Sequence, residues 1–258
     1  MPAELRLVLR QVHYEQLSFW LNPVGAIFTV GFALLFLIML GASAGSSRVS
    51  YLHNIKLVQY YVPGFIAYGV MSAAFNSLAI SLVIRRETGL LKRLRLSPLP
   101  TWTLVTSILL NTLLIAFVEV IVMLAVGRLA FGVQLPAGAS GIGALILVLA
   151  LGGLSFGALG VAMSTFIPNQ QAAGPIISTV FFVLLFLSGL WFPLKSGSAL
   201  AKISTFFPIR HFITGVFRTF SHPSASAWAG HDVLIVVIWG AVAAVVALRR
   251  FQWAPQRT

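Results

Sequence analysis

The chain has 258 residues, of which 59% are apolar and only 9% are charged, and its mean hydropathy is +0.96. Soluble domains have about 25% charged residues, so this chain has too few charges to cover a folded surface in water. The composition excludes an ordinary globular enzyme, a disordered chain and a nucleic-acid-binding module. It predicts a polytopic all-α membrane protein. The net charge of +12 is interpreted as basic residues that flank membrane spans and set their orientation.

Residues 1–22 are expected to form a cytoplasmic amphipathic helix that lies in the membrane interface. Six apolar residues fall within one arc of about 120° on a helical wheel: Leu5, Val8, Leu9, Val12, Phe19 and Trp20. Arg6 and Arg10 lie beside this arc, where they can meet anionic lipid headgroups. Two interpretations stay open: simple anchoring, or additional contact with a cytoplasmic partner.

Residues 23–258 are expected to form a domain of six transmembrane helices, because six apolar stretches approach or exceed the roughly 20 residues that a bilayer core requires. The predicted spans are 23–42, 63–84, 102–126, 142–167, 175–192 and 233–248. The first stretch is too long for a typical signal peptide and is predicted to be a retained span. Gly153, Gly157 and Gly160 are predicted to let neighbouring helices approach the fourth span closely.

The distribution of lysine and arginine predicts the orientation of these spans. With both termini on the cytoplasmic side of the cell membrane, the inner segments hold ten of these residues and the outer segments seven. The densest cluster lies in the short loop after the second span, where the rule is most reliable. We therefore expect both termini and this loop to be cytoplasmic.

This loop, residues 85–100, combines basic charge with a short amphipathic helix. Leu90 and Leu94 share one face and Leu91 lies beside them. Gly89 permits a bend before this helix, and two prolines end it. A loop that only set orientation would need charge alone, so the leucine face predicts a docking surface.

The loop sequence RRETGLLKRLRLSPLP resembles the loop between the first two membrane hairpins of ABC-2 type permeases, the membrane subunits of a large class of ATP-driven exporters. Two later stretches also resemble this family: LSGLWFPL at 187–194 and FFPIRH at 206–211. The resemblance covers nearly the whole chain. It is closest to the daunorubicin-resistance and nodulation-factor subgroup.

The resemblance implies an ABC exporter of amphiphilic drugs, lipids or glycolipids. It also implies two kinds of partner: separate ABC ATPase subunits, and a second permease subunit that is identical or different. In this family the loop passes the ATPase motion to the spans. The coupling residues would be Glu87, Gly89, Leu90, Leu91, Lys92, Arg93 and Leu94. The sequence contains no phosphate-binding Gly-x-x-x-x-Gly-Lys-Ser/Thr motif, so ATP and Mg²⁺ are expected on the partner and no cofactor on this chain.

Residues 193–232, before the last span, carry a run of aromatic and aliphatic residues with helical spacing. An apolar face outside the spans must be buried, so this segment is expected to be re-entrant or interfacial. The resemblance implies short re-entrant helices that cap the outer end of the pathway. Phe207, Arg210 and His211 are the candidate outer-gate residues. An interfacial helix without a gating role is the alternative.

Few polar residues lie within the spans. Ser72 and Asn76 share one face of the second span, where they either join helices by hydrogen bonds or line a cavity. Because the family's second and fifth spans line the space between two permease subunits, Ser72, Asn76, Phe182 and Phe186 are candidates for substrate contact.

Glu119 is the only acid within a predicted span, and such residues are functional candidates. Two positions are considered for its carboxyl group. It could pair with Arg210 or His211, or it could reach the outer interface.

No group of residues predicts catalysis. The histidine spacing does not predict a metal site, and the absence of cysteine excludes thiolate ligands. A secondary transporter or channel that works without ATP is the main alternative function. It would call for more acidic or polar residues in the spans and for an internal repeat. A non-transporting membrane scaffold is a second alternative, but it leaves the leucine-faced basic loop unexplained.

Overall fold

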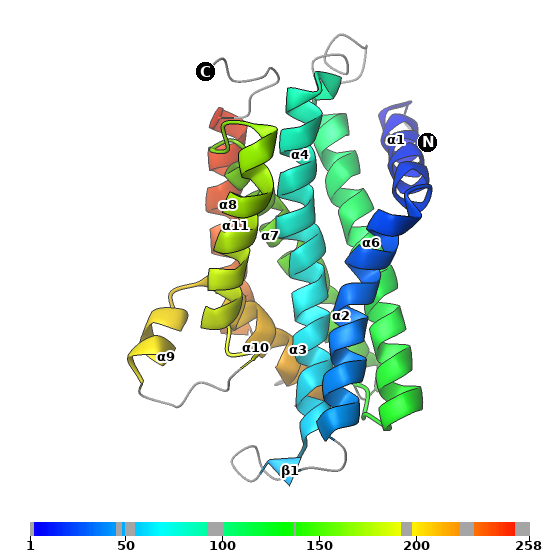
Figure 1. Cartoon of the computed structure of the whole chain (residues 1–258), viewed down its shortest axis with the longest axis vertical. Coiled ribbons are helices and arrows are strands. Elements are labelled where there is room, and N and C mark those ends of the chain that lie inside the picture. The colour runs from blue at the N-terminus through cyan, green and yellow to red at the C-terminus, as the bar shows by residue number, and fades with distance from the viewer. Residues whose placement is uncertain are drawn as a thin grey trace.

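The computed structural model describes residues 3–44, 48–49, 55–91, 101–136, 138–191, 198–221 and 230–250. Within these ranges the chain is a bundle of long helices, and α1 and the end of α11 lie at the same end of it (Figure 1). The only strands described are a two-residue antiparallel pair, β1 (Arg48–Val49) and β2 (Ile55–Lys56), at the opposite end. The predicted all-α membrane fold is confirmed apart from this short pair.

Each of the six predicted spans corresponds to a helix or a continuous helical stretch. Five stretches among the described residues are long and apolar enough to cross a membrane: residues 57–87, α6 (Thr101–Phe131), α7 (Gly138–Ser164), α8 (Gln170–Leu187) and α11 (Gly230–Arg250). The first predicted span is α2 (Pro23–Ala44), whose 22 residues have a shorter apolar stretch, Thr29–Ser43. At about 1.5 Å per residue, α2 is about 33 Å long, which is enough to cross a bilayer core.

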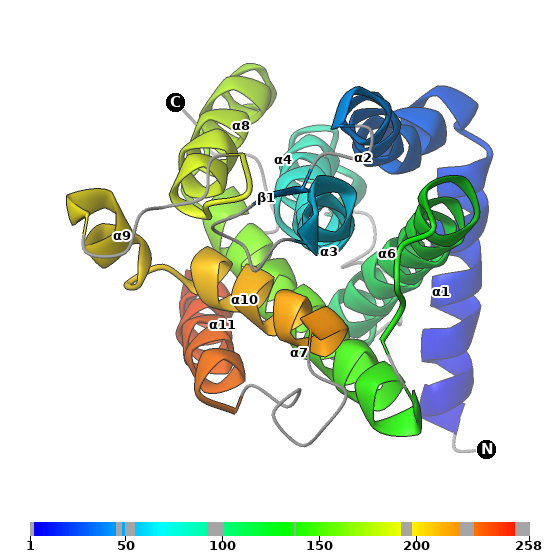
Figure 2. The same ribbon diagram turned by 90° about the horizontal axis from the view of Figure 1, so that it is seen from below.

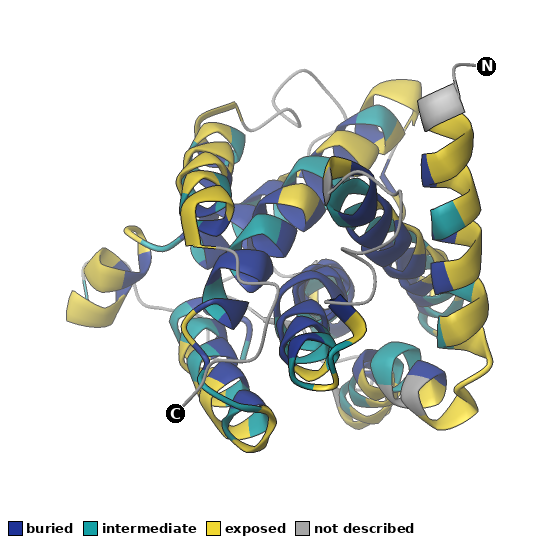
Figure 3. Cartoon of the chain, turned by 90° about the horizontal axis from the view of Figure 1, so that it is seen from above, coloured by how far each residue is buried: buried dark blue, intermediate teal, exposed yellow. Residues whose placement is uncertain are grey.

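The second span is the centre of the bundle. It consists of α3 (Leu57–Met71), a π-helical segment η2 (Ser72–Ser77) and α4 (Leu78–Glu87). Seen from below, α3 and α4 are surrounded by α2, α6, α7, α8 and α10 (Figure 2). In the view coloured by burial, this central helix is mostly dark blue, whereas α1, which begins at the N-terminus, is mostly yellow (Figure 3).

The glycines of α7 allow close packing, as predicted. A Cβ on Gly160 would lie 2.8 Å from the carbonyl oxygen of Ala74 and 3.0 Å from that of Phe75, both in η2. A Cβ on Gly153 or Gly157 would meet leucine side chains of α6. Only glycine lets the backbones of α7 and η2 approach this closely.

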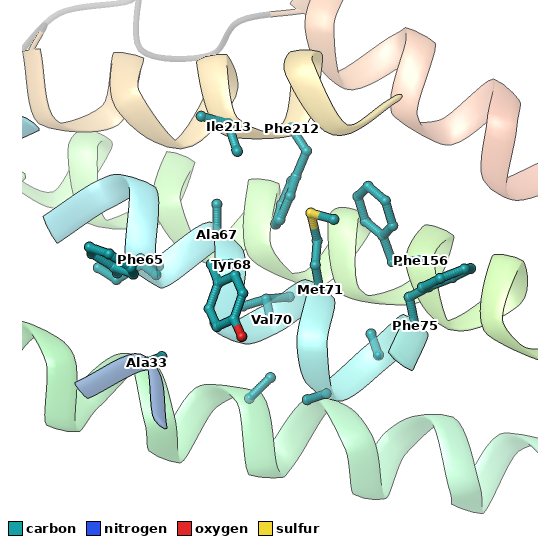
Figure 4. Packing of buried hydrophobic residues seen from close by; sticks show 14 of the residues in the cluster. Ala33, Phe65, Ala67, Tyr68, Val70, Met71, Phe75, Phe156, Phe212 and Ile213 are labelled. Atoms are coloured by element: carbon teal, nitrogen blue, oxygen red, sulfur yellow. The ribbon is translucent and has the colours of Figure 1, made fainter. Parts of the chain in front are cut away.

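Large apolar side chains fill the space around the central helix. Phe156 of α7 and Phe212 of α10 lie beside Met71 of α3 (Figure 4). The ring centroids of Phe156 and Phe212 are 5.4 Å apart, and Phe75 and Phe181 are stacked at 6.4 Å. These contacts join the second, fourth and fifth spans and α10 in one core.

The segment before the last span forms α9 (Ala199–Ser204) and α10 (Pro208–Ser221). Figure 2 shows α10 lying across the lower end of the bundle, over α7. Phe212 reaches Gly152, in the middle of α7, where a Cβ would collide with its ring. The apolar face of α10 is therefore inserted into the bundle, as expected of a re-entrant helix.

Candidate functional site

The N-terminal helix α1 (Ala3–Trp20) is docked on the bundle by one narrow face. Val8, Val12 and Glu15 are buried, and α1 packs against α6 and α2. Leu5 and Leu9, which the helical wheel placed on the same apolar face, are instead 43% and 48% exposed. They lie beside the buried face on the exposed side of α1, together with Arg6 and Arg10.

A bidentate ion pair joins α1 to the end of α4. Arg85 donates from Nη1 to Oε1 of Glu15 at 2.8 Å and from Nη2 to Oε2 at 2.6 Å. The Glu15 side chain is 7% exposed and the Arg85 side chain 22% exposed. Paired parallel hydrogen bonds of this kind fix geometry as well as contributing energy, so the orientation of α1 is linked to the second span.

The next residue, Arg86, links α4 to α7. Its buried guanidinium donates to the carbonyl oxygens of Ser164 at 3.2 Å and Ile167 at 2.6 Å, and to Glu87 at 3.1 Å. The last carbonyls of a helix have no partner within that helix and carry partial negative charge, so a cation stabilises them. Arg85 and Arg86 are therefore bound within the chain, at the point where the second span ends and the candidate coupling loop begins.

The beginning of the candidate coupling loop is sharply bent. Gly89 has φ +73°, a conformation that favours glycine, which confirms the predicted bend. Leu91 is only 1% exposed and packs with Leu82, Leu104 and other residues of the core, whereas Leu90 is 42% exposed. Leu91, which was expected to lie beside the docking face of Leu90 and Leu94, is therefore covered within the chain by α6 and α7 and is not available for docking.

Four other coupling residues were predicted, of which the structure describes only Glu87. Glu87 is paired with Arg86 and has a side chain that is 19% exposed. Lys92, Arg93 and Leu94 lie outside the described residues.

The candidate pathway residues divide into two groups. Asn76 and Ser72 are partly exposed, and Oδ1 of Asn76 accepts a hydrogen bond from Ser178 of α8 at 3.3 Å. Asn76 thus joins the second and fifth spans, which is the structural role considered for it. Phe182 and Phe186 are 49% and 59% exposed on the outward side of α8.

Both positions expected for Glu119 are wrong. Its side chain is 1% exposed, so it does not reach an interface, and neither carboxyl oxygen has a hydrogen-bond partner among the described residues. Arg210 binds Ser204 and His211 binds Asp232 instead. The carboxyl group packs instead against Gly69 of α3, where any Cβ would collide with it. The sequence could not show that a glycine on another helix provides this space.

The three candidate outer-gate residues make separate contacts. Phe207 stacks on Trp239 of α11 with ring centroids 6.4 Å apart, and Arg210 donates to Oγ of Ser204 at 2.9 Å. His211 is buried and contacts Asp232 of α11 at 2.7 Å. These contacts connect the start of α10 to α9 and α11. The three side chains have different partners and do not form one cluster.

A pocket of about 180 Å³ lies between α1, α2, the second span and α6, and sequence analysis did not predict it. Glu15 and Arg85 form part of its wall, and Asn111 of α6 contributes a buried Oδ1 without a hydrogen-bond partner in the described part of the chain. Its polar residues come from segments far apart in the sequence, so no local motif marks them.

Comparison with known proteins identifies the family. The model of the ABC-2 type transporter family matches residues 7–220. Over 160 residues the chain is 27% identical to a probable multidrug ABC transporter permease, YbhR, of Escherichia coli strain K12, and equally so to its counterpart in strain O157:H7. The match covers 62% of this chain but only 43% of those relatives, so the chain spans less than half of their length. The chain belongs to the ABC-2 type transporter family, as a multi-pass membrane protein.

Proposed function

We propose that this chain is the permease subunit of an ATP-driven exporter. It moves an amphiphilic drug, lipid or glycolipid across the bacterial cytoplasmic membrane by alternating access. The family match and the multidrug permease relatives support this proposal. ATP and Mg²⁺ bind to separate ABC ATPase subunits, and this chain contributes no catalytic residue and no cofactor.

The observation that carries the proposal is the pair of arginines at the end of the second span. Arg85 is bound to α1, and Arg86 is bound to the carbonyl oxygen of Ser164 at the end of α7. Both precede the bend at Gly89 by only a few residues. A force applied to the loop is therefore transmitted together to α4, to α1 and to α7. A loop that couples the ATPase to the spans must move several helices in this way.

The loop contacts the ATPase through its exposed part. The exposed Leu90 and the partly exposed Glu87 lie at its start, and Lys92, Arg93 and Leu94 would continue the contact on the partner's surface. Leu91 anchors the loop to the bundle. With this loop and both termini in the cytoplasm, Arg6 and Arg10 on α1 lie at the inner leaflet, where anionic headgroups favour basic residues.

A second permease subunit, identical or different, completes the pathway. The exposed side chains of Phe182 and Phe186 supply an apolar wall suited to an amphiphile. Ser72 and Asn76 are partly exposed polar groups on the neighbouring span. Substrate would pass between these surfaces as the two subunits separate on one side and close on the other.

The proposal is tested by measuring ATPase binding and efflux separately. The tagged chain is co-expressed with its ATPase, and retained ATPase is measured after purification in detergent. Leu90→Ala is expected to reduce both retention and efflux. Leu129→Ala, an 86% exposed leucine near the opposite end of α6, is the matched control and is expected to change neither.

Two results would contradict different parts of the proposal. Unchanged ATP-dependent efflux after replacement of residues 87–94 by a Gly/Ser sequence would refute the coupling role of the loop. Efflux that follows an ion gradient and needs no ATPase would instead favour the secondary transporter.

A further inference from the structure

Three residues that could bind a metal meet where α10 enters the bundle and α11 begins. His211 comes from α10, and His231 and Asp232 come from the first turn of α11. One ligand atom from each lies within 4.8 Å of the other two. His211 and Asp232 are buried and His231 is exposed. Two of the ligands are therefore held in place by packing, and a metal ion can reach the third from solvent.

The hydrogen bonds of His211 call for a proton or a metal ion at its Nδ1. Its Nε2 is 2.8 Å from the carbonyl oxygen of Thr205, which can only accept, so Nε2 carries the hydrogen. Its Nδ1 is 2.7 Å from Oδ1 of Asp232. A neutral ring would then point its Nδ1 lone pair at a carboxylate, which is repulsive. Either a proton or a metal ion must occupy this position.

The arrangement of His211 is also the one that metal-bound histidines adopt. Such residues donate their second ring nitrogen to a carbonyl or carboxylate, which fixes the tautomer and the direction of the ligating nitrogen. The bond to Thr205 does this here. Nδ1 is thereby directed at Asp232, and the ring of His231 lies nearby, with the centroids of the two histidine rings 5.9 Å apart.

A second, independent observation concerns the other carboxylate oxygen. Oδ2 of Asp232 is buried and has no hydrogen-bond partner among the described residues. Arg218 forms an ion pair with this oxygen, with its Nη2 3.5 Å away and its side chain 47% exposed. This contact is an ion pair without a hydrogen bond, so Oδ2 keeps its lone pairs for a metal ion.

We propose that His211, His231 and Asp232 bind a divalent transition metal of the Zn²⁺ type, with the fourth position open to water. Two imidazoles and one carboxylate are a common three-residue ligand set for zinc. Tetrahedral ligands at about 2.1 Å from zinc lie about 3.4 Å apart. On metal binding, the ligating nitrogen of His231 must therefore move closer to the other two ligand atoms, which are now up to 4.8 Å from it. The distance between Nδ1 of His211 and Oδ1 of Asp232 must increase from 2.7 Å. The bound metal joins α10 to α11 and holds α10 in its inserted position.

The test uses the full-length chain, purified in detergent through a tag without histidines and treated with a chelator. Co²⁺ is the spectroscopic probe. We expect one Co²⁺ per chain with the visible absorption of a tetrahedral site, and displacement by Zn²⁺. We also expect Zn²⁺ to raise the temperature of unfolding.

His231→Gln is the main variant, because this exposed side chain can be changed without disturbing the core. We expect it to weaken Zn²⁺ binding at least tenfold and to remove the Zn²⁺-dependent shift in unfolding temperature. His13→Gln, on the exposed face of α1 at the other end of the bundle, is the control and should behave as the unmodified chain. Absence of a tetrahedral Co²⁺ spectrum, or equal Zn²⁺ affinity in His231→Gln, would overturn the proposal. Neither readout requires the ATPase, so the proposed transport function is tested separately.

Discussion

The ion pair between Glu15 and Arg85 should determine how tightly α1 is docked, and Glu15→Gln tests this. An exposed ion pair contributes up to about 1 kcal/mol, whereas removal of one partner from a buried pair costs about 3–5 kcal/mol. This pair lies between these limits, because the side chains are 7% and 22% exposed. We therefore expect Glu15→Gln to weaken docking by about 2 kcal/mol, which is about 30-fold in the ratio of undocked to docked α1.

The chain contains no cysteine, so a single introduced thiol can report undocking. Val8 lies on the buried face of α1 and is 4% exposed. In a Val8→Cys chain, maleimide labelling requires α1 to open, and Glu15→Gln should speed labelling by about 30-fold. Leu9→Cys, at a position that is 48% exposed, should label at the same fast rate with or without Glu15→Gln.

Two comparisons make the result specific to the ion pair. Arg10→Gln changes an exposed arginine of the same helix and should leave the labelling of Val8→Cys unchanged. Arg85→Gln combined with Glu15→Gln should cost less than the sum of the single changes, since the two residues interact directly. Additive effects, or an acceleration below about threefold for Glu15→Gln, would refute the reasoning.

Three further predictions concern stability, measured as thermal unfolding in detergent. Gly160→Ala should destabilise the chain by about 1–3 kcal/mol, because its Cβ would meet backbone oxygens of η2. Gly174→Ala, with open space around it, is the control, and equal unfolding temperatures for the two variants would contradict the prediction. Leu91→Ala should cost about 2–5 kcal/mol and Leu90→Ala less than about 1 kcal/mol, because only Leu91 is buried; the reverse order would be inconsistent with the anchoring role. Gly89→Ala should cost about 1 kcal/mol, because φ is +73°, and no loss of stability would argue against the bend.

The spans could be predicted because crossing a bilayer requires a long apolar stretch, and this requirement is visible in the sequence. Their ends were less accurate: the second span begins at Leu57 rather than near residue 63. The π-helical segment within it could not be predicted, since it lies against Gly160 of another helix. Packing between elements decides this local geometry.

The candidate site was predicted less completely for the same reason. The loop pattern identified Gly89 and the leucines at 90, 91 and 94, but only the positions of α6 and α7 show that Leu91 is covered. The link between Glu15 and Arg85 joins residues 70 positions apart in the sequence. Likewise, the histidine cluster depends on α10 folding back onto the start of α11.

The most direct test of the account is transport by purified components in lipid vesicles. The chain is reconstituted alone, with its ATPase and ATP, and with its ATPase and a non-hydrolysable ATP analogue, and the movement of a fluorescent amphiphile is measured. We predict transport only when the ATPase can hydrolyse ATP. Equal movement of the amphiphile by the chain alone would contradict the claim that an external ATPase drives this permease.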